Sequence, residues 1–312
     1  MIEVAMLLLG IALVVYGAER FVQGIAGSAL VLGVSSFALG VIFGGFDAEN
    51  LGTGIAAAVK GLPGISLGTV IGSSIFLLGA AVGITALLIP LEVRVPARYI
   101  LLTLLSPLPM FALMLDGTLS RYDGIALLVI SLPVIGYIVR DSRHCTFLEK
   151  DEEFEEVLEE REEKPAWYFP ALLLFSLVVI IAGAELLVRG AKGIIQSFGI
   201  SDTLLGMVFV AAAVSFEEVA RMVVPAWRGR PEISMGNILG TVLFFVLFNI
   251  GLIALASPLE VERSVVSFHF PAMMLILAAT SAFMLNGKIS RGNGIVLIVL
   301  YLAYLILNYY YL

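Results

Sequence analysis

The stretch SLGTVIGSSIF at residues 66–76 has a near copy in SMGNILGTVLF at residues 234–244, 168 positions further along the chain. Three further pairs follow the same order at almost the same spacing: YGAE at 16–19 with AGAE at 182–185, PLEVR at 90–94 with PLEVE at 258–262, and DGTLSRYDG at 116–124 with NGKISRGNG at 286–294. Four matches in one order predict that the chain consists of two related halves.

The composition around these repeats is that of a membrane protein. Of the 312 residues, 60% are hydrophobic and 14% charged, whereas a soluble domain has about 25% charged residues. Most apolar segments reach the roughly 20 residues that a helix needs to cross a bilayer. We therefore predict an all-α membrane protein whose ten transmembrane helices lie near 2–33, 36–60, 65–90, 97–115, 122–140, 167–196, 202–227, 233–256, 266–285 and 292–311.

The repeat and the charges predict how the halves are arranged. Five helices per half is an odd number, so the second half enters the membrane from the opposite side, as in the inverted repeats of transporters. We expect a first repeat at 1–140, a linker at 141–166 and a second repeat at 167–312. Loops after odd-numbered helices carry eleven Lys and Arg residues against three in the others. This bias predicts a cell-membrane protein with a cytoplasmic linker and both termini extracellular.

The formal net charge of −7 comes from one segment, 148–164, which holds ten acids and three bases. We interpret it as a solvated linker, with a regulatory cation-sensing role as the alternative. The sequence has no basic patch, so we do not expect nucleic acid as a partner. We identify no signal peptide, no Walker sequence, no nucleophile elbow and no His/Cys cluster, so neither an enzyme nor a bound cofactor is expected. The single cysteine, Cys145, excludes an intrachain disulfide.

Two predicted helices carry acids at membrane depth, in GGFDAENLGTG at 44–54 and AAAVSFEEVARMVVP at 211–225. Charged groups there are costly and usually line a polar cavity or an ion path. Acids from both halves supply the oxygen ligands that calcium prefers. The candidate metal ligands are Asp47, Glu49, Asn50, Ser73, Ser215, Glu217, Glu218 and Asn237.

Two other features bear on this site. We expect the glycines around the acids of the second helix and Pro225 in the seventh to break those helices and free carbonyls for cations. Arg221 follows Glu217 by four residues and Glu218 by three, so either acid can pair with it along one helix face. Arg221 then either points away from the site or neutralises an acid there.

The chain resembles the calcium/cation antiporter superfamily, which includes sodium/calcium and proton/calcium exchangers. The family carries a Glu on the second helix of each half, then a basic residue with Gly, then G-N-x-x-G on the third helix. Glu218 stands ten residues before Arg228-Gly229 and eighteen before Gly236-Asn237. The resemblance implies that helices 2, 3, 7 and 8 form an ion-binding core, with Glu218 as a ligand, and that helices 1 and 6 slide against it.

The first half departs from the family pattern. Asn50 stands where the family has its Glu, and Glu49 lies one position earlier, so which of the two takes the ligand position stays open. Several family hydroxyls and amides are replaced, whereas extra carboxylates are present, and neighbouring buried carboxylates take up protons. We therefore expect exchange of calcium for protons by alternating access. The alternatives are sodium/calcium exchange, a degenerate non-transporting member that senses cations, and a channel; the oligomeric state is left open.

Overall fold

The computed structural model describes residues 2–31, 47–92, 95–142, 164–165, 167–229 and 231–311. Most of the predicted linker and residues 36–46 of the second predicted helix lie outside these ranges. The helices are α1 (Ile2–Val31), α3 (Ala48–Val59), α4 (Pro63–Leu67), η1 (Gly68–Gly72), α5 (Ser73–Ile75), η2 (Phe76–Ala81), α6 (Val82–Leu88), α7 (Ala97–Leu105), α8 (Pro107–Leu113), η3 (Met114–Asp116), α9 (Arg121–Ser142), α11 (Tyr168–Phe198), α12 (Asp202–Leu204), η4 (Leu205–Val210), α13 (Ala211–Val214), α14 (Glu217–Trp227), α15 (Pro231–Leu243), η5 (Phe244–Asn249), α16 (Ile250–Ala256), η6 (Val265–His269), α17 (Phe270–Leu285) and α18 (Arg291–Tyr311). The strands are β1 (Leu91–Glu92), β2 (Thr118–Leu119), β3 (Leu259–Glu260) and β4 (Lys288–Ile289).

The molecule is a helical membrane protein. Within the described residues, eight helical segments are long and apolar enough to cross a bilayer: Ile2–Phe21, Pro63–Leu88, Ala97–Asp116, Tyr168–Phe198, Asp202–Trp227, Pro231–Ala256, Val265–Leu285 and Arg291–Asn308. Each overlaps a range predicted from the sequence. Several of these segments combine α-helical with π-helical turns. The prediction of long apolar helices is confirmed for these eight.

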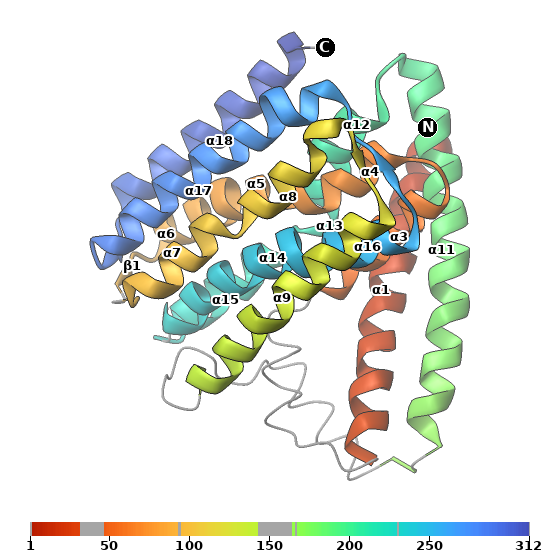
Figure 1. The fold of residues 1–312 in the computed structure, drawn as a ribbon, viewed down its shortest axis with the longest axis horizontal. Helices are drawn as coiled ribbons and strands as arrows, with labels where there is room; N and C mark the ends of the chain where they lie inside the picture. The colour runs from red at the N-terminus through yellow and green to blue at the C-terminus, as the bar shows by residue number, and fades with distance from the viewer. Residues whose placement is uncertain are drawn as a thin grey trace.

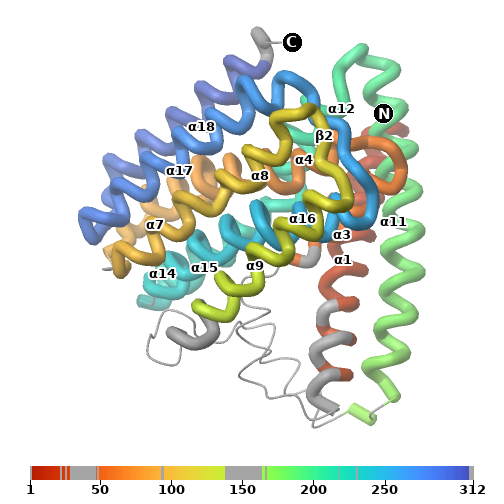
Figure 2. The backbone as a smooth tube through the Cα atoms, in the orientation of Figure 1, coloured from red at the N-terminus to blue at the C-terminus, as the bar shows by residue number. Residues whose placement is uncertain are grey.

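The two longest helices, α1 and α11, lie side by side at one end of the molecule and run in a different direction from most of the others (Figures 1 and 2). Small residues let them approach closely. A Cβ atom on Gly190 would come within 2.3 Å of the backbone nitrogen of Leu7, and one on Gly183 within 2.8 Å of that of Val14. Glycine at these positions therefore permits backbone-to-backbone packing, as is common between membrane helices.

A second close contact joins the segment α4–η1 to η4. A Cβ atom on Gly68 would lie 2.3 Å from the carbonyl carbon of Gly206, and one on Gly206 would lie 2.4 Å from the carbonyl oxygen of Gly64. The Asp202 carboxylate accepts a hydrogen bond from the Gly64 backbone nitrogen at 2.8 Å. The two backbones touch here with no room for side chains, which fixes the third predicted helix against the seventh.

Equivalent segments of the two sequence halves adopt equivalent structure. Strands β1 and β3 are 168 positions apart, and β1 pairs with β4 while β2 pairs with β3, both antiparallel. The π-helical turns η2 and η5 also lie 168 positions apart. The same N-terminal cap recurs on α9 and α18, where Ser120 pairs with Asp123 and Ser290 with Asn293. The sequence repeat is thus also a structural repeat at these points.

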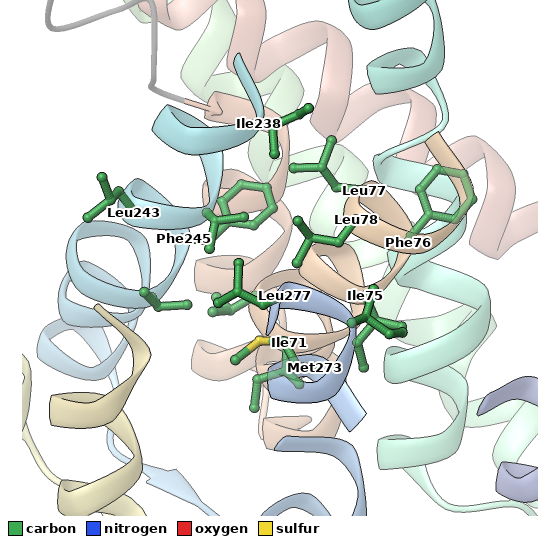
Figure 3. Close-up of a cluster of buried hydrophobic side chains, with 14 of the residues drawn as sticks. Ile71, Ile75, Phe76, Leu77, Leu78, Ile238, Leu243, Phe245, Met273 and Leu277 are labelled. Carbon is green, nitrogen blue, oxygen red and sulfur yellow. The ribbon is translucent and has the colours of Figure 1, made fainter. Parts of the chain in front are cut away.

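A buried apolar cluster holds the central helices together (Figure 3). The helix from α4 to η2 contributes Ile71, Ile75 and Leu77, and it packs against Phe245 of η5 and Met273 of α17. All five side chains are fully buried. Close packing of this kind restricts rotation of the helices, and so it fixes the direction in which their few polar residues point.

The interruption of the seventh predicted helix was placed wrongly. The sequence suggested Pro225, but Pro225 lies inside α14, which continues to Trp227. The break falls at Ser215 and Phe216, between α13 and α14, where Ser215 has φ −103° and ψ 8°. Proline removes one backbone hydrogen bond and can be accommodated by a bend, whereas the backbone angles at Ser215 end the α-helical ladder.

The contact between Gly68 and Gly206 gives a first prediction. Gly68→Ala places a methyl group inside the Gly206 backbone, and overpacking of this kind costs about 1–3 kcal/mol. We expect a lower melting temperature for the detergent-purified variant. Gly136→Ala is the matched control, because a Cβ atom on Gly136 of α9 meets nothing within 4 Å. Equal melting temperatures for the two variants would contradict the close contact.

Candidate functional site

The start of α3 presents the first acid of the site. Asp47 caps the helix with extended backbone, φ −100° and ψ 98°. One of its carboxylate oxygens accepts from the Asn50 backbone nitrogen at 2.7 Å, and the other accepts from Asn50 Nδ2 at 2.6 Å. An Asp at this position satisfies a backbone donor that the helix itself leaves open. The cap explains why a polar pair, buried among apolar helices, forms at this point in the chain.

Asn50 connects three elements. Besides donating to Asp47, its Nδ2 donates to Ser215 Oγ at 3.3 Å, and its Oδ1 accepts from Ser73 Oγ at 2.6 Å. Asn50, Ser73 and Ser215 are all fully buried. Buried polar groups need such partners. The amide thus joins α3 to α5 and to the break between α13 and α14, and it carries no charge.

The second sequence half supplies Glu218, on the first turn of α14. Its Oε2 accepts from Asn237 Nδ2 at 2.7 Å, and Asn237 Oδ1 accepts from Thr241 Oγ1 at 3.3 Å. Both Asn237 and Thr241 lie on α15. Glu218 is therefore oriented by the next helix in sequence, just as Asn50, 168 positions earlier, is oriented by Ser73.

Arg221 brings acids of both halves together. Its Nη2 lies 3.5 Å from Glu49 Oε1, and its Nη1 lies 3.6 Å from Glu218 Oε1. The two acids are 2% and 1% exposed, whereas the Arg221 side chain is 24% exposed. A buried carboxylate is stable only with a compensating charge or hydrogen bonds. Of the two orientations left open by the sequence, Arg221 adopts the one that faces the acids.

The structure places most of the predicted site residues in one region. Asp47, Asn50, Ser73 and Ser215 form one hydrogen-bonded group, and a second group consists of Glu49, Arg221, Glu218 and Asn237. Glu217 begins α14, but its side chain is outside the described set. Among the described side chains, no three His, Cys, Asp or Glu residues are grouped so as to hold a metal ion. The four-acid cluster therefore stays a prediction.

One polar residue of this region escaped the sequence argument. Asn249, at the end of η5, is fully buried, and its Nδ2 donates to the backbone oxygen of Asp47 at 3.4 Å. Its counterpart 168 positions earlier is Ala81, so the repeat gives no sign of it. The usable signal was a lone amide inside the apolar run FFVLFNIG at 244–251, since such residues are costly in membrane helices.

The pairing of Asp47 with Asn50 gives a second prediction. Asn50→Asp puts two carboxylates at hydrogen-bond distance and removes two donated hydrogen bonds, so we expect a melting temperature well below that of the wild type in chelator. The exchange of both residues, Asp47→Asn with Asn50→Asp, restores one amide and one carboxylate, and Asn also caps helices. The double variant should recover most of the loss. A fully stable Asn50→Asp protein would contradict the pairing.

Comparison with known proteins identifies the family of this chain. The sequence family described as sodium/calcium exchanger protein matches residues 2–135 and 168–310. The putative antiporter CaxA of Alkalimonas amylolytica is 27% identical over 95% of each chain. The sodium/calcium exchanger MaX1 of Methanosarcina acetivorans is 26% identical over 97% of each chain.

A solved structure shares the fold. The sodium-calcium exchanger NCX_Mj, soaked with 2.5 mM Na+ and 0.1 mM Ca2+, superposes with a TM-score of 0.59 at 27% identity, and the match covers 97% of each chain. The family match spans most of the sequence and includes both groups of polar residues. The chain therefore belongs to the sodium/calcium exchanger protein family.

Proposed function

We propose that this protein is a secondary active transporter that exchanges calcium for protons by alternating access. The observation that carries the proposal is the meeting of Glu49 and Glu218, from opposite sequence halves, within 3.5 and 3.6 Å of one guanidinium in a buried region. Negative charge at membrane depth is costly and is kept where ions bind or pass. Two carboxylates, with nearby amide and hydroxyl oxygens, have the ligand chemistry that calcium requires.

The proposed ligands are the predicted set. Asp47, Glu49 and Asn50 come from the second helix, and Glu217 and Glu218 from the seventh. Ser73, Ser215 and Asn237 complete it. The hydrogen bonds that tie Asn50 to Ser73 and Glu218 to Asn237 support this assignment, because ligands oriented by their neighbours bind with less loss of entropy. Asn50 is uncharged and donates from Nδ2 to Asp47 and Ser215, so we assign the first-half ligand position to Glu49.

The membrane arrangement that goes with this function is ten helices in two inverted repeats, 1–140 and 167–312, joined by the linker 141–166. The pairing of β1 with β4 and of β2 with β3 supports it, because each ribbon joins loops that the arrangement puts on the same side of the membrane. Both termini are then extracellular and the acidic linker is cytoplasmic, following the positive-inside rule.

The coupling ion is proposed from ligand chemistry. Where the family's sodium sites have amides and hydroxyls, this chain has apolar residues such as Val242 and Phe245, both fully buried, while it carries additional acids. Acids can exchange a metal ion for protons. Sodium coupling is the second candidate, because the relative MaX1 is named a sodium/calcium exchanger. A non-transporting cation sensor is the third, favoured by the position of Arg221.

Transport into vesicles provides the third prediction. Protein reconstituted in liposomes should accumulate labelled calcium when a pH gradient is imposed, and Glu218→Gln should abolish uptake because it removes half of the proposed pair of charges while keeping an acceptor for Asn237. The control is Glu262→Gln, an exposed loop acid, which should transport like the wild type.

Two outcomes would change this proposal in different ways. Uptake that responds only to a sodium gradient would replace protons with sodium as the coupling ion and leave calcium as substrate. Absence of uptake under either gradient, in protein that is folded and reconstituted, would favour the non-transporting cation sensor.

A further inference from the structure

Arg221 contacts two buried acids of the site, Glu49 and Glu218, and its position raises a question that the proposed function does not answer. The guanidinium lies 3.5 Å from Glu49 Oε1 and 3.6 Å from Glu218 Oε1. These two oxygens belong to the carboxylates that the proposed function assigns to calcium. A metal ion and a guanidinium cannot share that space, because like charges at such distances repel strongly in a buried setting.

We propose that Arg221 is a tethered competitor of the substrate: its guanidinium takes the place between Glu49 and Glu218 that calcium must occupy, and it has to leave before calcium binds. The proposal rests on the proposed function, since it concerns the same site. In this proposal Arg221 lowers the affinity of the site for calcium, in addition to any contribution it makes to the stability of the fold.

The geometry allows the guanidinium to leave. The two acids are almost fully buried, at 2% and 1%, but the Arg221 side chain is 24% exposed. Its contacts to the acids are at ion-pair distance, longer than the 2.7 Å hydrogen bond by which Asn237 holds Glu218. A long side chain anchored on α14 can swing outward while its helix stays in place, and Asn237 then keeps Glu218 oriented for the incoming ion.

The pattern of the two halves supports a role in the site. Position 221 corresponds, 168 positions earlier, to Thr53, which is fully buried and neutral. One guanidinium therefore serves acids from both halves. Glu49 and Glu218 attract a divalent cation more strongly when the guanidinium has moved away than when it lies beside them, because its positive charge repels the ion.

The test is equilibrium binding of labelled calcium to the purified full-length protein. Arg221→Gln should bind calcium roughly tenfold more tightly or better, because the competing charge is gone. Arg221→Lys should stay near the wild type, since it keeps a mobile cation. The matched control is Arg228→Gln, which removes an exposed charge two turns further along the same segment and should leave the affinity unchanged. Equal or weaker binding by Arg221→Gln overturns the proposal.

Thermal melting checks the same idea without transport. In chelator, Arg221→Gln should melt below the wild type, because two buried acids lose their counter-charge. Added calcium should then raise the melting temperature of Arg221→Gln more than that of the wild type, since the shift grows with affinity. The triple variant Glu49→Gln, Arg221→Gln, Glu218→Gln should recover stability in chelator and lose the response to calcium. If calcium raised the melting temperature of the wild type and of Arg221→Gln equally, Arg221 would have a structural role alone, and the proposal would be overturned.

The results separate this inference from the proposed function. Tighter calcium binding by Arg221→Gln, with no transport by the wild type in vesicles, supports the tethered competitor and overturns the exchanger. Transport by the wild type, with unchanged affinity in Arg221→Gln, does the reverse. Failure of both proteins to bind calcium overturns both.

Discussion

Two carboxylates buried among apolar helices place a constraint on this protein that the rest of the site has to satisfy. Glu49 and Glu218 are almost inaccessible to solvent, and an uncompensated buried carboxylate costs several kcal/mol. A nearby positive charge, a hydrogen-bond donor or a bound proton offsets this cost. Arg221 provides a positive charge within 4 Å of both acids, and in a transporter the substrate cation can provide one as well. The competition between these two charges is the basis of the role inferred for Arg221.

The surrounding structure keeps the acids within reach of one cation. The backbone contact between Gly68 and Gly206 brings the third predicted helix against the seventh. The break at Ser215 turns α14 so that Glu218 and Arg221 enter the same region, and the Asp47 cap starts α3 just before Glu49. Asn50 then links α3, α5 and Ser215 through hydrogen bonds that carry no net charge. Rigid packing of apolar side chains holds these helices in register (Figure 3).

Much of this could be predicted from the sequence, because two of its signals are strong. Length and apolarity placed eight helices that the structure confirms, and the repeat of PLEV and of the Ser-Arg motifs marked segments that pair as short strands or cap helices. Acids inside apolar helices identified Glu49 and Glu218, since few other reasons exist to bury them. Apolar stretches, repeated motifs and acids within apolar stretches can all be read directly from a single sequence.

The remainder depended on three-dimensional contacts that composition does not encode. Pro225 was expected to break its helix, but the interruption falls at Ser215, where backbone angles and the hydrogen bond from Asn50 decide the geometry. The direction of Arg221 depends on Glu49, 172 residues away in sequence, and Asn249 contacts Asp47 across a similar separation. Sequence periodicity carries no information about contacts between residues this far apart in the chain. The sequence could therefore name candidate site residues, but it could not predict which of them contact one another.

The account depends most directly on where a divalent cation binds. An anomalous difference map from a crystal soaked in manganese, which has the oxygen preference of calcium and a usable anomalous signal, answers this in one measurement. The account predicts a peak between the carboxylates of Glu49 and Glu218, with the Arg221 guanidinium moved away from it. A peak only on the surface, or an unchanged Arg221 beside both acids at saturating manganese, would contradict the central claim.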